Sequence, residues 1–147
     1  MKAHIGVDAG SGLVHSLEAT PANVSDVTKA HDLLHGEEAM AFGDAGYQGV
    51  EKRPEAGANP VRWHVAMRAS KRRTLPDTHL GRIMEQMEAL KASIRAKVEH
   101  PFHIIKNRFG LKRTRYKGLA KNTDQLFTLL GLANLFIAKR SLLGTAG

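Results

Sequence analysis

Asp44 stands in the segment of the chain that is best suited to metal-dependent chemistry. An apolar run at residues 39–42 precedes it and predicts a short strand that is covered on both faces. Gly43, Gly46 and Gly49 surround it, and glycine lets a backbone turn sharply or approach a ligand closely. A carboxylate at such a strand end offers the oxygen ligands that Mg²⁺ prefers. The alternative is that Asp44 only caps the turn that follows it.

A second acid, Glu99, lies between two cations at helical spacing. Arg95 precedes it by four residues and Lys106 follows it by seven, so the three side chains would share one face of a helix. Residues 91–121 contain ten Lys and Arg but only this one acid. Glu99 therefore either forms an internal ion pair with a neighbouring cation or joins Asp44 in a metal site.

Two acids that are far apart in the chain suit the cleavage or joining of a phosphodiester. Such a reaction must activate a water or a 3′-hydroxyl and neutralise the charge of the transition state, and two bridged Mg²⁺ ions can do both. Asp44 and Glu99 are accordingly the candidate catalytic and metal-binding residues, with Mg²⁺ or Mn²⁺ as the expected cofactor. The sequence contains no Walker-type phosphate loop, nucleophile elbow or dinucleotide fingerprint that would indicate another reaction.

The sequence resembles bacterial insertion-sequence DDE transposases, which have an RNase H-like core. Gly-Asp-Ala-Gly-Tyr-Gln-Gly at 43–49 and Arg-x3-Glu-x6-Lys at 95–106 resemble the second and third acidic blocks of that family. Three further segments are similar to it: residues 23–26, 67–73 and 98–102. The family has a tyrosine three residues before the arginine, where this sequence has Ala92. The resemblance implies a DNA transposase that cuts and joins strands at insertion-sequence ends. The absence of cysteine is compatible with a cytoplasmic location.

The resemblance also implies that the sequence is N-terminally truncated. Residues 2–8 resemble the interior of the family's second core strand, and the first catalytic aspartate would lie upstream of them. We expect one partial catalytic domain over residues 1–147, with an α/β fold in which helices flank an RNase H-like mixed sheet that lacks its first strand. The chain alone would then be inactive or nearly so, because an incomplete ligand set positions the attacking oxygen poorly. Asp8 could replace the missing acid, although its Gly-rich surroundings favour a turn.

Charge is divided unevenly along the chain. Residues 1–60 carry four Lys and Arg against nine Asp and Glu, and residues 61–147 carry eighteen against five, for a net charge of +8. The basic part predicts DNA binding through phosphate contacts. The candidate DNA-binding residues are Tyr47, Lys71, Arg72, Arg73, Arg95 and Lys106. Tyr47 is as typical of core packing as of base stacking. Charge alone also fits the alternative function, a non-catalytic basic module that binds nucleic acid or a protein partner.

Composition limits the other partners. No cysteine is present, which excludes disulfides and thiolate metal sites. The apolar segment at residues 126–138 is too short to cross a bilayer, so we expect no membrane partner. We also expect DNA as the partner and no small-molecule substrate. Self-association into a homo-oligomer is a further expectation, because a missing strand would leave a sheet edge unpaired.

Periodicity predicts the elements that hold these residues. The expected elements are a hairpin of residues 2–8 and 13–20, a helix from 25 to 36, and strands at 39–42 and 62–68. Lys71, Arg72 and Arg73 fall in a loop. A long helix follows, capped by Thr78, and an apolar helix begins at Asn122 or Thr123. The long helix carries a stripe that predicts core packing: Leu80, Met84, Met87, Leu90, Ile94 and Val98.

Overall fold

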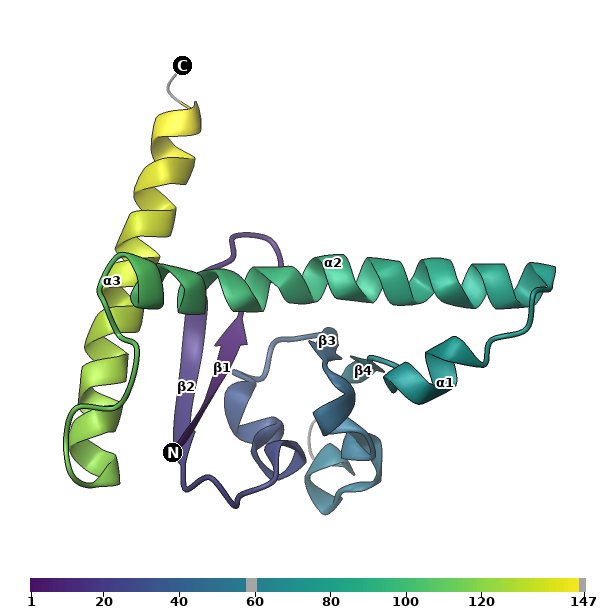
Figure 1. Ribbon diagram of the computed structural model, residues 1–147, viewed down its shortest axis with the longest axis horizontal. Coiled ribbons are helices and arrows are strands. Elements are labelled where there is room, and N and C mark those ends of the chain that lie inside the picture. The colour runs from purple at the N-terminus through teal and green to yellow at the C-terminus, as the bar shows by residue number, and fades with distance from the viewer. Residues whose placement is uncertain (58–60, 146–147) are drawn as a thin grey trace. The chain divides into compact units, whose positions relative to one another are not determined.

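A computed structural model describes residues 1–57 and 61–145 as a mixed α/β chain with two compact units (Figure 1). The first unit combines Met1–Val24 with the chain from Lys97 onward, and the second is Ser25–Ala96. Within the described residues, four strands form two separate two-stranded sheets. The α/β class is confirmed, but the strands do not pair into the one mixed sheet that was expected. That the units belong to one RNase H-like domain stays a prediction.

The first unit contains the predicted hairpin. Strands β1 (Lys2–Val7) and β2 (Val14–Thr20) pair antiparallel, with Ile5 opposite Leu17 and an irregularity after Gly6. Alternating apolar residues give the hairpin one face that can be covered. The hairpin prediction is therefore confirmed.

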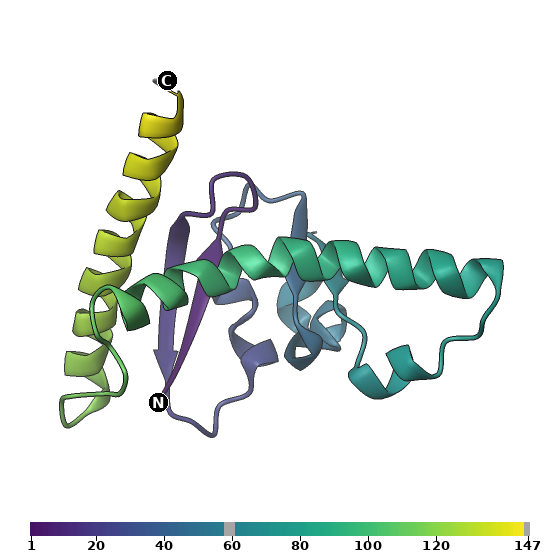
Figure 2. The same cartoon turned by 45° about the horizontal axis from the view of Figure 1, so that its top comes forward.

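Two helices cover the apolar face of the hairpin formed by β1 and β2. Helix α3 (Leu119–Thr145) runs beside β2, as Figure 2 shows, and the end of helix α2 (His79–Asn107) packs with it. The Asn134 side chain binds both backbone groups of Val14, donating to the carbonyl at 2.7 Å and accepting from the N–H at 2.8 Å. The buried core consists of Ile5, Ile104, Ile105, Leu126, Leu130 and Ala133.

Helix α3 is longer than its apolar segment suggested. By length and composition alone it could cross a bilayer, with a mean hydropathy of 1.5 over its most apolar window. Such evidence is weak for a single helix, because core helices of soluble proteins pass the same test. The expectation that the chain has no membrane partner stays a prediction.

The second unit is built on a short parallel pair, β3 (Met40–Gly43) and β4 (Arg62–Val65). In the described part of this unit, five short 3-10 helices accompany the pair: Asp26–Lys29, His31–Leu33, Ala45–Tyr47, Val50–Lys52 and Pro54–Gly57. The first two replace the continuous helix that was expected after Ser25. The strand before Asp44 is present but is not covered on both faces, since Met40 is 54% exposed.

Two α-helices complete this unit. Helix α1 (Ala69–Arg73) occupies the place where a basic loop was predicted, so that prediction was wrong. Helix α2 begins after Thr78, whose hydroxyl oxygen accepts the Gly81 N–H at 3.2 Å. This bond satisfies one of the free N–H groups of the first turn, as predicted.

The apolar stripe of α2 does not form the core of the second unit. Leu80, Met87 and Leu90 are exposed, whereas Glu88 is buried. The Glu88 carboxylate accepts the Met67 N–H at 2.8 Å and the Lys91 ammonium at 2.7 Å. The predicted core packing was therefore wrong here, because the chain beyond β4 presents backbone polar groups to α2 rather than apolar side chains.

Candidate functional site

Asp44 lies directly after β3, as predicted, and its carboxylate shapes the next turn. Its backbone is extended and its Oδ1 accepts the Gly46 N–H at 2.8 Å, which caps the short helix that follows. The capping alternative is thus what the local geometry shows. One accepted hydrogen bond leaves a carboxylate with further lone pairs, so capping and metal binding are compatible.

A second carboxylate, Asp26, approaches the same turn. A Cβ atom on Gly46 would lie 2.9 Å from Asp44 Oδ1 and 3.0 Å from Asp26 Oδ2, so a larger residue here would push against both carboxylates. Sequence reasoning did not select Asp26 as a site residue. The available signal was its place in the segment 23–26, which resembles the family.

Tyr47 packs beside these acids. Its ring stacks on Trp63, with centroids 6.3 Å apart and an angle of 13° between the planes. Burial raises the pKa of Tyr47 to about 12, and the negative charges of Asp26 and Asp44 add to that increase. The ring face that was predicted to stack on a nucleotide is therefore used, at least on one side, for internal packing.

The residues present fit a divalent cation. Carboxylate oxygens are the ligands that Mg²⁺ and Mn²⁺ prefer, and the side-chain-free Gly46 lets Asp26 and Asp44 approach one turn. The Asp44 end of the proposed site thus has suitable donor chemistry within the second unit.

Glu99 is exposed on α2 in the first unit. It forms no ion pair with any described residue, so the structure does not support the alternative of an internal pair with Arg95 or Lys106. Arg95 is partly buried and Lys106 is exposed. Because Asp44 belongs to the second unit, the approach of the two candidate carboxylates stays a prediction.

Asp8 holds the hairpin turn. Its carboxylate accepts the Ser11 hydroxyl and the Ser11 N–H, each at 2.6 Å, and its carbonyl accepts the Gly12 N–H. The Ser11 hydroxyl bond, followed by its N–H bond, lowers the pKa of Asp8. The turn role that the sequence favoured is present.

The cations of α1 differ from one another. The Nε of Arg72 donates to both carboxylate oxygens of Glu85 on α2, each at 3.0 Å. The hydrogen bond from Arg72 lowers the pKa of Glu85. Lys71 and Arg73 are exposed and form no ion pair with the described residues. Arg72 therefore joins two helices, while its two neighbours are available to a phosphate.

The family described as the transposase DDE domain matches residues 1–135, a range that includes Asp26, Asp44 and Glu99. No solved structure matches the chain.

Proposed function

The chain belongs to the family of transposase DDE domains, and on this premise we propose that it takes part in DNA transposition by cutting and joining strands at insertion-sequence ends. The observation that carries the proposal is the family match over residues 1–135, which places the chain among proteins that generally use divalent metal. Asp44 and Glu99 stand where the sequence resembles the second and third acidic blocks. We propose that the chain has an RNase H-like fold. We also propose that it acts on DNA in the cytoplasm.

The proposed roles follow from donor chemistry. Asp44 and Glu99 would hold Mg²⁺ or Mn²⁺ through carboxylate oxygens. The bound ion would stabilise the charge that develops on the phosphate and lower the pKa of the attacking hydroxyl or water. Glu99, which has no ion-pair partner among the described residues, needs no cation to be displaced before it can act as a ligand.

Metal binding separates this function from the alternative of a non-catalytic basic module. We expect Mn²⁺ titration, followed by calorimetry or by the electron paramagnetic resonance of free Mn²⁺, to show a site that weakens at least tenfold in Asp44→Asn and in Glu99→Gln. The exposed Glu51 lies outside the proposed site, so Glu51→Gln is the matched control. Salt-dependent DNA binding without any such metal site would favour the alternative.

Strand cleavage tests the expectation about the first acid. With DNA that carries the element's ends and Mg²⁺ or Mn²⁺, we expect cleavage only from a form extended at its N-terminus to supply that acid. Cleavage by residues 1–147 that is lost in Asp8→Ala would instead make Asp8 the third ligand.

A further inference from the structure

We propose that the loop between α2 and α3, residues 108–118 and here called the basic loop, binds a nucleic-acid strand through its phosphates, with an unpaired base stacked on Tyr116. The inference rests on the proposed function, since it identifies a DNA contact that is separate from the metal site and from α1. All of its residues lie in the first unit.

The basic loop concentrates positive charge without neutralising it. It contains five cations and no acid: Arg108, Lys112, Arg113, Arg115 and Lys117. All five are exposed, and none forms an ion pair with a residue that the structure describes. Arg72 on α1, by contrast, is held by Glu85. Like charges at such density repel one another, and a phosphate backbone relieves that repulsion.

Hydrogen bonds hold both ends of the loop in place. The Leu111 N–H donates to the Ile105 carbonyl of α2 at 3.0 Å. At the other end the buried Asn122 amide donates to the carbonyls of Tyr116 at 2.7 Å and Gly118 at 2.6 Å, and accepts the Tyr116 N–H at 3.2 Å. A loop that is already ordered loses less conformational entropy when it binds.

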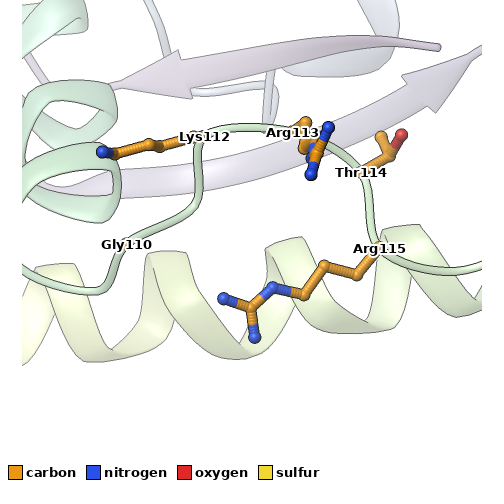
Figure 3. A pocket seen from close by; sticks show the side chains of 5 residues that line it. All are labelled: Gly110, Lys112, Arg113, Thr114 and Arg115. Atoms are coloured by element: carbon orange, nitrogen blue, oxygen red, sulfur yellow. The ribbon is translucent and has the colours of Figure 1, made fainter.

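The loop borders a half-open hollow of about 460 Å³ (Figure 3). Its lining residues are Gly110, Lys112, Arg113, Thr114 and Arg115. Figure 3 shows the three cationic side chains leaving the loop at separate points, with Arg115 reaching across in front of α3. Three of the five lining residues are cations and a fourth carries a hydroxyl, and these donors suit phosphate oxygens.

Tyr116 adds a surface for a base. It stands between Arg115 and Lys117 and is 52% exposed, while its backbone is fixed by Asn122. Exposed aromatic rings among cations bind single strands by stacking, because every base has a flat face. Bases in a duplex are already stacked on their neighbours, so Tyr116 favours a strand with an unpaired base.

An anionic membrane is the competing partner, because the loop precedes the apolar helix α3. Lipid headgroups would be attracted by the same cations. A flat membrane surface does not enter a concave hollow, however, whereas a strand can place single phosphates in it. The shape of the loop therefore favours nucleic acid.

The test measures fluorescence anisotropy of labelled single-stranded and duplex DNA of equal length, each over a range of salt concentrations. The loop variant carries Lys112→Ala, Arg113→Ala and Arg115→Ala. The control carries Lys52→Ala, Arg62→Ala and Arg82→Ala, which remove the same charge from exposed positions of the second unit. We expect the loop variant to bind at least tenfold more weakly than the control and to lower the salt slope for single strands by about 2.

Tyr116 is tested separately. Tyr116→Leu should weaken binding of the single strand more than that of the duplex, and Tyr116→Phe, which keeps the ring, should not. If the unaltered chain binds DNA and the loop variant matches the control, this inference is overturned while the proposed function stands. If the unaltered chain binds no DNA, both are wrong. Binding to phosphatidylglycerol vesicles in place of DNA would assign the loop to a membrane.

Discussion

The two parts of α2 bury different kinds of side chain. In the second unit, His79–Ala96 buries the carboxylate of Glu88, which is 5% exposed, and leaves Leu90 62% exposed. In the first unit, Lys97–Asn107 buries Ile105, which is 1% exposed, and leaves Glu99 in solvent. One helix thus packs through an ion pair in one unit and through apolar side chains in the other.

The neighbours of each part account for the difference. The end of α2 meets the apolar residues of the hairpin and of α3, so burying Ile105 removes apolar surface from water. The earlier part meets the Val65 carbonyl and the Met67 N–H, which Lys91 and Glu88 satisfy. Unpaired backbone groups are costly to bury, so a polar partner is required there. Helical periodicity identifies a stripe, but the neighbour decides which stripe is buried.

The largest effect should come from the apolar part. Ile105→Ala would leave a cavity in the core of the first unit and lower the free energy of unfolding by about 3–5 kcal/mol. Leu90→Ala removes a similar side chain from an exposed position and should change it by less than about 0.5 kcal/mol. Urea unfolding followed by circular dichroism measures both variants. Equal losses would mean that Leu90 is covered in solution.

The polar part should be sensitive to a different change. Glu88→Ala removes the acceptor of the Met67 N–H and the charged partner of the Lys91 ammonium, which keeps only the Val65 carbonyl as an acceptor. We expect a loss of about 2–3 kcal/mol, less than for a fully buried pair because the Lys91 side chain is 19% exposed. Hydrogen exchange should show faster exchange around β4 and unchanged exchange in the hairpin. Faster exchange in the hairpin would contradict the distinction between the two parts.

Lowering the pH should reduce the stability only of the part of α2 that contains Glu88. Burial raises the pKa of Glu88, but hydrogen bonds from Lys91 and Met67 outweigh it and hold that pKa below the ordinary glutamate value. The stabilisation is therefore complete above the unfolded-state pKa of about 4.3 and is lost as the pH falls through the folded-state value. Glu88→Gln should lack this pH-dependent contribution. Parallel stability curves for the two proteins between pH 6 and 3 would exclude it.

Local sequence patterns correctly predicted the structural features that depend on residues close together in the chain. The hairpin, the cap at Thr78 and the position of Asp44 after a strand all follow from a few adjacent residues. Contacts across longer separations were not predicted, such as Arg72 with Glu85 and the approach of Asp26 to Gly46.

The long-range contacts were not predicted because residues of these types more often have other structural roles. Arg72 is one of three consecutive cations, a pattern that is usually solvated, and the fold selects it for an ion pair. Asn122 and Asn134 are typical of helix starts or surfaces, yet their amides bind backbone groups in the first unit. The sequence contains the polar groups but does not identify the backbone atoms they meet.

The smallest effects should have opposite signs at two helical glycines. A Cβ atom on Gly81 would overlap the Pro76 carbonyl oxygen, whereas nothing lies within 4 Å of such an atom on Gly131 in α3. Gly81→Ala should lower the free energy of unfolding by about 1–2 kcal/mol, because backbone must move to admit the methyl group. Gly131→Ala should raise it by about 0.5–1 kcal/mol, because alanine loses less conformational entropy in a helix.

Thermal and urea unfolding of both variants tests these signs, with Gly144→Ala as a control near the end of α3, where a Cβ atom also meets nothing. A stabilising Gly81→Ala would show that α2 begins without the close contact to Pro76. A destabilising Gly131→Ala would show that its face of α3 is covered in solution, because a methyl group costs stability only where it meets another atom. Gly131 lies on α3 and Gly81 on the polar part of α2. The signs of the two changes in the free energy of unfolding therefore report how closely the helix backbone is packed in each unit.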